Sequence, residues 1–89
     1  MKYEIHPDLD KILARLAKRD KVQYEAIMKK VAEVISSENL THYKNLRSPL
    51  QEYKRVHVHS SFVLLFLIKN DTICFRYYDH HDNIYQRTL

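Results

Sequence analysis

The spacing of apolar residues changes from a helical to a strand period part-way along the chain, and this change constrains the fold more than any other feature. Between residues 7 and 36 apolar residues recur every three to four positions, which predicts two amphipathic helices. His6 and Pro7 suit the start of the first helix, and Asp20 with Gln23 resembles a capping box that begins the second. With so short a link, the helices should pack as an antiparallel hairpin. The predicted buried positions are Leu9, Ile12, Leu13, Leu16, Tyr24, Ile27, Met28, Val31 and Ile35.

From residue 53 onward the period is two, which is typical of β-strands. Strands are predicted over residues 53–59, 62–68 and 72–78, with turns at Ser60-Ser61 and Asn70-Asp71, and a further short strand around residues 3–5. The run 62–68 is apolar on both faces, which predicts a central strand covered on both sides. Residues 39–52 lack a period, carry Pro49 and are predicted to form a loop.

Alternation assigns side chains to the two faces of these strands. In the strand 53–59, one face carries Tyr53, Arg55, His57 and His59, and the other carries Lys54, Val56 and Val58. In the strand 72–78, one face carries Ile73, Phe75 and Tyr77, and the other carries Cys74, Arg76 and Tyr78. The element order predicts a single α+β domain over residues 1–89, β-α-α-β-β-β, with a small, mostly antiparallel sheet packed against an α-helical hairpin.

The composition excludes several function classes. The 89 residues contain no glycine, which excludes the phosphate-binding loops, the dinucleotide fingerprint and the G-x-S-x-G elbow, because each needs backbone without a Cβ. Cys74 is the single cysteine, so neither an internal disulfide nor a cysteine-cluster zinc site is possible. A net charge of +4 favours polyanionic partners such as nucleic acid. With no signal peptide and no long apolar run, we expect a cytoplasmic protein.

Histidines stand at two places where the predicted sheet presents polar residues. His57 and His59 share one strand face, and His80 and His81 directly follow the last strand. Imidazoles beside Arg47, Lys54 and Arg55 would combine proton-transfer groups with positive charge. Metal-free RNA cleavage requires this combination, because the ribose 2′-OH needs a base, the leaving 5′-oxygen needs an acid, and the phosphorane needs positive charge.

Two other interpretations of the histidines remain open. His57 and His59, with a third histidine or Asp82, could hold zinc with an open water position. The nearby Arg47, Lys54, Arg55 and Arg76 disfavour this, because they would repel a dication. The histidines could also be ordinary solvated side chains on an exposed sheet face.

Three segments of the chain share the pattern of a known family. They are Leu46-Arg47-Ser48, Tyr53-Lys54-Arg55-Val56-His57-Val58 with the aliphatic run from Phe62, and His81-Asp82-Asn83-Ile84-Tyr85. The first is similar to a Leu-Arg-Gly loop before the second strand, and the others are similar to the YafQ strand pattern and C-terminal ending. On these residues the chain resembles the RelE/ParE toxin superfamily, closest to the YafQ-like ribosome-dependent mRNA interferases.

The resemblance implies a RelE-like toxin of a type II toxin-antitoxin system. Such a toxin is a cytoplasmic endoribonuclease that cleaves mRNA in the ribosomal A site without a cofactor or metal and inhibits translation, and a cognate antitoxin of the RelB or DinJ type neutralises it. By the same resemblance, His57 and His81 transfer protons and Tyr85 contributes to catalysis. The expected RNA- and phosphate-binding residues are Arg47, Lys54, Arg55, His59 and Arg76.

Two positions depart from the family pattern. Val63 stands where RelE has an important arginine, and Ser61 stands where YafQ has a functional aspartate. A catalytically weakened member is therefore one alternative. A non-enzymatic, ParE-like toxin that binds a topoisomerase is another, and a metal-dependent hydrolase is a lesser one.

Overall fold

The computed structural model describes residues 2–47 and 50–87, so Ser48 and Pro49 of the predicted loop lie outside the described residues. The elements are β1 (Lys2–Ile5), α1 (Pro7–Arg19), α2 (Lys21–Ser36), the 3₁₀ turn η1 (Leu40–His42), β2 (Lys54–Val58), β3 (Phe62–Lys69), β4 (Thr72–His80) and α3 (His81–Ile84). One sheet has the order β1-β4-β3-β2, with β1 parallel to β4 and the other pairs antiparallel. The predicted α+β fold is confirmed.

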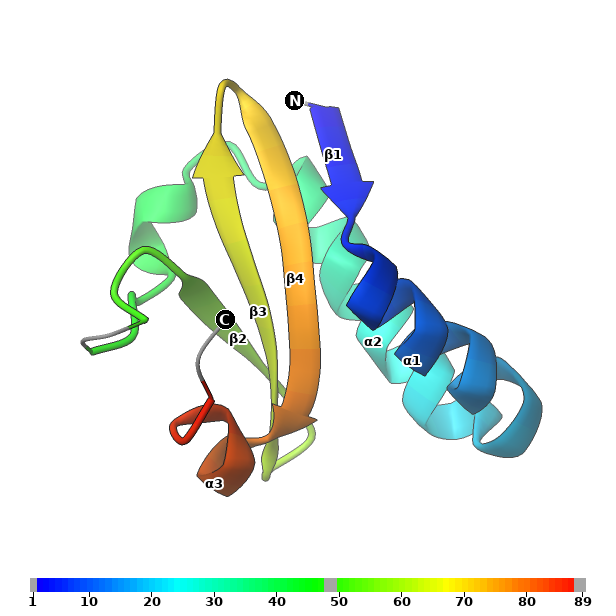
Figure 1. The fold of residues 1–89 in the computed structure, drawn as a ribbon. Coiled ribbons are helices and arrows are strands. Elements are labelled where there is room, and N and C mark those ends of the chain that lie inside the picture. Colours follow the sequence, from blue (N-terminus) through cyan, green and yellow to red (C-terminus); the bar gives the residue numbers. More distant parts are fainter. Residues whose placement is uncertain (1, 48–49, 88–89) are drawn as a thin grey trace.

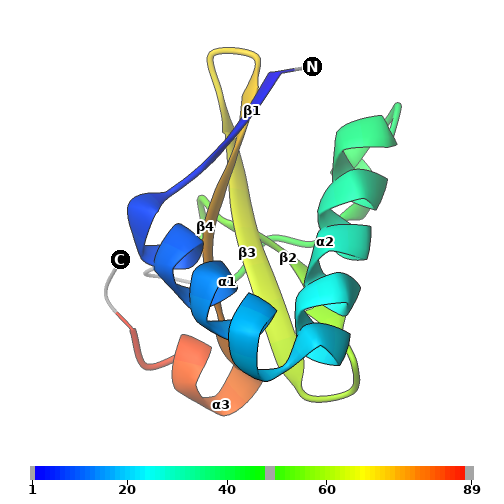
Figure 2. The same cartoon turned by 90° about the vertical axis from the view of Figure 1, so that its right-hand side faces the viewer.

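The helices α1 and α2 run in opposite directions and cover one face of the sheet (Figures 1 and 2). Their starts follow the predicted signals. The Nδ1 atom of His6 accepts a hydrogen bond from the backbone of Asp8 at 3.1 Å, and Asp20 accepts one from the backbone of Gln23, also at 3.1 Å. Each bond satisfies a backbone N–H group that the first turn of a helix leaves without a partner. The predicted helical hairpin and its capping by Asp20 are confirmed.

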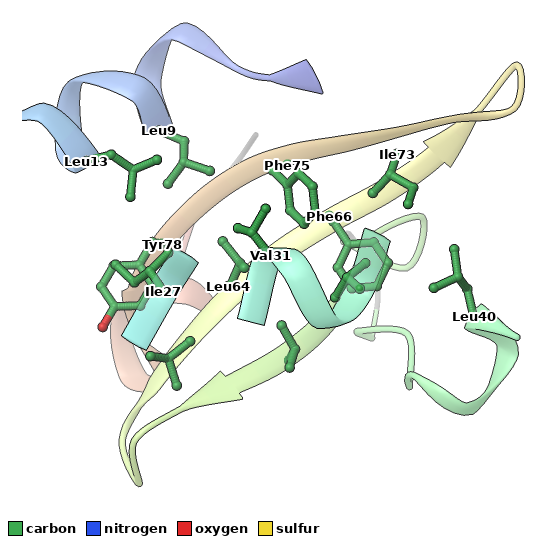
Figure 3. Packing of buried hydrophobic residues seen from close by; sticks show 13 residues of the cluster. Leu9, Leu13, Ile27, Val31, Leu40, Leu64, Phe66, Ile73, Phe75 and Tyr78 are labelled. Atoms are coloured by element: carbon green, nitrogen blue, oxygen red, sulfur yellow. The ribbon is translucent and has the colours of Figure 1, made fainter. Parts of the chain in front are cut away.

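The helix-side core fills the space between these two helices and the sheet (Figure 3). Phe66 and Phe75 are fully buried in it, with their ring centroids 6.0 Å apart. On α2, Val34 is fully buried whereas the predicted Ile35 is only partly buried. The buried residues of the helix-side core are Leu9, Leu13, Ile27, Val31, Val34, Leu40, Val56, Val58, Leu64, Phe66, Ile73, Phe75 and Tyr78.

A smaller group of buried residues, the loop-side cluster, lies on the opposite face of the sheet. It consists of Leu46, Leu50, Tyr53, Val63, Leu65 and Ile84. Because Val63 and Leu65 alternate with Leu64 and Phe66 on β3, this strand is covered on both faces, as predicted. The segment 39–52 is mostly irregular, as expected, but it contains η1 and supplies Leu46 and Leu50 to this cluster. The loop therefore forms part of the packing of this second face.

The structure corrects the predicted faces of β4. Phe66 pairs with Phe75 while Leu65 pairs with Tyr77, so Arg76 is an extra residue that forms a β-bulge. The bulge shifts the alternation by one position. Tyr78 consequently joins the helix-side core, and Tyr77 packs against the loop-side cluster. The strand also continues to His80, two residues beyond its predicted end.

The two turns of the β-meander are made without glycine. Positive φ angles of 53° and 58° occur at Asn70 and Asp71, which form the predicted turn between β3 and β4. Asparagine and aspartate tolerate this left-handed backbone better than other residues with a side chain. Between β2 and β3 the positive φ, 58°, falls on His59 and ends the strand at Val58. Within the described residues, no helix has the length and apolar character needed to cross a membrane.

Candidate active site

A cavity of about 410 Å³ opens on the loop-side face of the sheet. It is lined by Asn45, Leu46, Arg47, Arg55 and Tyr85. Arg55 belongs to β2, Arg47 to the preceding loop, and Tyr85 directly follows α3, so three separate segments meet there. The guanidinium group of Arg55 donates a hydrogen bond to the Tyr85 hydroxyl. The structure therefore brings together three of the residues predicted from the sequence.

The loop that forms one wall of this cavity is held by Lys54. The ammonium group of Lys54 donates to the backbone oxygen of Tyr43 at 3.2 Å and to Oδ1 of Asn45 at 3.0 Å. The amide of Asn45 in turn donates to the backbone oxygen of Gln51 at 2.9 Å, across the loop. Lys54 thus ties the loop to β2 and does not line the cavity. A direct phosphate contact by Lys54 stays a prediction.

His57 lies on β2 two residues beyond Arg55, so both side chains face the same side of the sheet. The ring is exposed, and the residue pairs with Val63 of β3, which pairs with Asp79 of β4. Neighbouring strands lie about 4.8 Å apart, so His57 and the end of β4 are separated by roughly 10 Å of sheet. His57 therefore shares a sheet face with Arg55, and its ring is open to solvent.

His81 is the first residue of α3, at the same end of the sheet as His57. Its backbone nitrogen donates to the backbone oxygen of Ser61 at 2.9 Å, which fixes the start of α3 beside the turn after β2. The Nδ1 atom of His81 lies 2.9 Å from Oδ1 of Asp82. Ile84, one turn later, is fully buried in the loop-side cluster and holds α3 on the face that carries His57.

Two of the predicted phosphate ligands lie elsewhere, and the prediction that His59 shares a strand face with His57 is wrong. His59 lies in the turn and lines a separate hollow with Asp20 and Val22 at the start of α2. Arg76 projects from the bulge toward the start of α1, where its guanidinium lies 3.2 Å from both Nδ1 of His6 and Oδ2 of Asp8. Alternation could locate neither residue, because a turn and a bulge interrupt it.

The predicted zinc site required His57 and His59 to project from the same strand face. His59 lies in the turn after β2, so it does not share that face. Another group, His80, His81 and Asp82, has its potential ligand atoms within 4.8 Å of one another. In this group Nδ1 of His80 already accepts a hydrogen bond from the backbone of Asp82 at 3.2 Å. His80 therefore acts as the N-cap of α3, as His6 does for α1.

Comparison with known proteins assigns the family. No protein-family model matches the chain. A protein of Methanocaldococcus jannaschii named "Putative toxin RelE4" is 54% identical over 86 residues, which cover 94% of this chain and 89% of that protein. The chain belongs to the RelE/ParE toxin superfamily. It is the toxin component of a toxin-antitoxin system, of the RelE, YafQ and YoeB type.

Two solved structures show that this toxin shares its fold with distant relatives. The YoeB/ParE toxin from Agrobacterium tumefaciens has a TM-score of 0.77 at 10% identity, covering 91% of this chain and 99% of that one. A chain of the E. coli DinJ-YafQ toxin-antitoxin complex has a TM-score of 0.63 at 15% identity, covering 94% of this chain and 96% of that one. At such identities the likeness concerns the fold alone.

Of the two positions where this toxin departs from the family pattern, one lies beside His57 and the other beside His81. Val63 is fully buried in the loop-side cluster and pairs directly with His57 across the sheet. Ser61 presents its backbone oxygen to His81, and its hydroxyl lies 3.5 Å from that of Ser60. The positive charge lining the cavity therefore comes from Arg47 and Arg55.

Sequence reasoning missed Asp79, which supports the element carrying His81 and Tyr85. Its carboxylate accepts hydrogen bonds from the backbone of His80 at 2.7 Å and from the Asn83 amide at 3.2 Å, and it accepts two from Arg87 at 3.1 and 3.3 Å. Burial raises the pKa of Asp79, but the hydrogen bonds and the Arg87 charge outweigh it and hold the pKa below its ordinary value. A single aspartate before a histidine pair carries no local sequence signal for this role.

Proposed function

We propose that this toxin is an endoribonuclease that cleaves mRNA in the A site of the ribosome and thereby inhibits translation. The reaction is an attack of the ribose 2′-oxygen on the adjacent phosphorus, catalysed by His57 and His81 as an acid-base pair and requiring no metal. Tyr85 contributes together with Arg55 at the phosphate. The observation that supports this most directly is the Arg55–Tyr85 contact in the cavity, on the sheet face that also presents His57.

The arrangement suits a substrate held between two imidazoles. One of them accepts the proton of the 2′-hydroxyl as the bond from oxygen to phosphorus forms. The other, protonated, gives its proton to the 5′-oxygen as the bond from phosphorus to that oxygen breaks. The products are a 2′,3′-cyclic phosphate and a 5′-hydroxyl. Groups that act in this way each contribute about 10²- to 10⁴-fold to the rate.

The arginines that line the cavity would stabilise the negative charge on the reacting phosphate. An arginine fork can donate to two phosphate oxygens at once, and Arg55 is held in place by Tyr85. Arg47 also lines the cavity, from the loop that Lys54 ties to β2. Because these charges meet a phosphorane whose negative charge grows during the reaction, they stabilise the transition state more than the bound substrate.

The partner that controls such a toxin is an antitoxin, here proposed to be of the RelB or DinJ type. The net charge of +4 is complementary to an acidic segment of such a protein. An amphipathic segment that orders on binding could cover basic and apolar surface together. Binding over Arg55 and His57 would exclude mRNA from the cavity.

Primer extension on translating ribosomes tests the proposal. The wild-type protein should produce discrete cleavages in translated mRNA, and His57→Ala and His81→Ala should each lower the rate by about 10²- to 10⁴-fold. His42→Gln, a change at an exposed loop histidine outside the cavity, is the matched control and should cleave normally. Cleavage should persist in a zinc-selective chelator that leaves the Mg²⁺ of the ribosome in place.

Three outcomes would contradict the proposal. Normal cleavage by the double variant His57→Ala, His81→Ala would rule out the acid-base pair. Intact mRNA together with a DNA-damage response would favour a ParE-like binder of topoisomerase. Loss of cleavage in chelator, restored by added zinc, would favour a metal-dependent hydrolase.

A further inference from the structure

The helix α3 is too short to be stable on its own. It has four residues, and an isolated helix of that length does not form in water because the first turn is unfavourable to nucleate. Contacts beyond the helix's own backbone hydrogen bonds therefore hold it in place. They are the His80 cap, the buried side chain of Ile84 and the hydrogen bonds to Asp79.

Asp79 joins three consecutive parts of the chain through one carboxylate. The backbone of His80 belongs to the end of β4, Asn83 belongs to α3, and Arg87 lies in the segment after α3. The Asp79 side chain is 20% exposed, so these hydrogen bonds are only partly screened by water. Arg87 has a second anchor, since its guanidinium carbon lies 4.3 Å from the centre of the Tyr77 ring.

The same short stretch of chain carries two of the residues that the proposed reaction needs. His81 is the first residue of α3, and Tyr85 directly follows its last residue. Asp79 itself does not line the cavity between Arg55 and Tyr85. It therefore reaches the reacting groups only by fixing the element on which they stand.

We propose that Asp79 is a positioning residue that, with Arg87, fixes α3 so that His81 and Tyr85 meet the RNA substrate. This inference rests on the proposed ribonuclease function. A displacement of about 1 Å in a catalytic group can cost on the order of 100-fold in rate. We call the hydrogen bonds of Asp79 to Asn83 and Arg87 the clamp. Loss of the clamp should therefore slow the chemical step more than it weakens the binding of mRNA, which depends on charges placed elsewhere.

The test uses two variants that weaken the clamp from opposite sides. Asp79→Asn keeps the shape of the side chain but removes the charge that holds Arg87, and Arg87→Gln removes the partner. Asp71→Asn is the matched control, because it makes the same chemical change in an exposed turn where asparagine tolerates the φ of 58°. Each protein is measured for cleavage on programmed ribosomes and for amide hydrogen exchange.

Both clamp variants should lower the saturating cleavage rate by about 10- to 100-fold, with the half-saturating ribosome concentration within about twofold of wild type. Exchange should speed up at the amides of Ile84 and Tyr85, and the amides of β3 should keep their protection. The double variant should lose little more than either single one, because both remove the same contact. The control should match the wild type in every measurement.

Unchanged exchange at Ile84 and Tyr85 in both variants would overturn the inference. So would faster exchange with an undiminished cleavage rate, because the clamp would then be purely structural. Failure of the proposed function gives a separate result: the wild-type protein itself would not cleave. In that case the exchange data alone decide whether Asp79 fixes α3.

Discussion

The two faces of the sheet differ in what covers them. Two helices of 13 and 16 residues close the face that holds Phe66 and Phe75. The opposite face is covered by the 39–53 loop and by the four residues of α3, and beside this cover lies the cavity with Arg55 and Tyr85. The thoroughly packed face supplies stability, whereas the sparsely covered face leaves the cavity open. In this toxin the side chains of the main core and those of the candidate site are thus largely different.

The largest effect should come from the helix-side core. Phe66→Ala removes a fully buried ring between β3 and the helices and should lower the free energy of unfolding by about 3–5 kcal/mol. Urea denaturation followed by circular dichroism measures this. Val22→Ala, at a side chain that is 73% exposed on α2, should change stability by less than about 0.5 kcal/mol. Equal effects of the two changes would contradict the assignment of this core.

The corresponding change on the other face should uncouple stability from activity. Ile84→Ala empties a buried position under α3 and should cost about 2–3 kcal/mol, toward the lower end for such changes because a single turn can relax. Cleavage should fall at least tenfold while the protein remains folded, because His81 and Tyr85 lose their support. The control is Ile68→Ala, at a side chain that is 39% exposed. Full activity in folded Ile84→Ala would show that α3 is not needed for the reaction.

A substitution in the cavity should affect cleavage alone. Arg55→Lys keeps the charge but loses the planar fork that can contact both Tyr85 and a phosphate, so the rate should fall on the order of tenfold. The free energy of unfolding should stay within about 0.5 kcal/mol of wild type. Arg19→Lys, at the end of α1, makes the same change away from the cavity. Normal cleavage by Arg55→Lys would refute phosphate binding through a fork.

Loss of the cap at the start of α2 should lower stability and leave cleavage unchanged. Asp20→Ala removes the acceptor at the start of α2 and should lower the free energy of unfolding by about 1 kcal/mol. Cleavage at a temperature where both proteins are folded should not change. Asp20→Asn retains a side-chain oxygen and should restore most of the stability. A loss of activity in Asp20→Ala at such a temperature would connect the two faces.

The smallest effect concerns the dependence of stability on pH. Because folding lowers the pKa of Asp79 from its ordinary value of 3.8, the ionised carboxylate stabilises the fold at neutral pH. This contribution is lost as the pH falls below 3.8 toward the lower pKa of the folded state. The difference in unfolding free energy between wild type and Asp79→Asn should therefore shrink from pH 7 to pH 3. A difference that does not vary with pH would contradict the ionised clamp.

Much of the fold could be predicted because its signals are local. The stripe of Leu9 and Leu13, the cap at Asp20 and the turn at Asn70 each depend on residues a few positions apart. These features specify two helices and a β-meander without reference to the segments that pack against them. The resemblance to the toxin family then pointed to Arg55 and Tyr85, which the structure brings together.

The remaining features leave no readable pattern in the sequence, and one of them depends on pairing between distant segments. The bulge at Arg76 exists only relative to the register with β3, so no pattern within β4 reveals it. His59 fits the alternation of β2 but lies in the turn with a positive φ. Asp79 binds residues on both sides of α3, a helix too short to show a period. The bulge and the turn decide which charges reach the cavity.

The parallel pairing of β1 with β4 has a consequence for how the toxin is made. β1 lies at the edge of the sheet, and its residues Lys2 to Ile5 pair with Thr72 to Phe75. During synthesis β1 therefore cannot pair until β4 has been made. Pairing them closes a long loop at an entropic cost. The helices can form early, but the sheet, whose strand β2 carries His57, is completed only after β4 has been translated. A ribosome that makes this toxin thus has to translate β4 and α3 before the candidate active site can form.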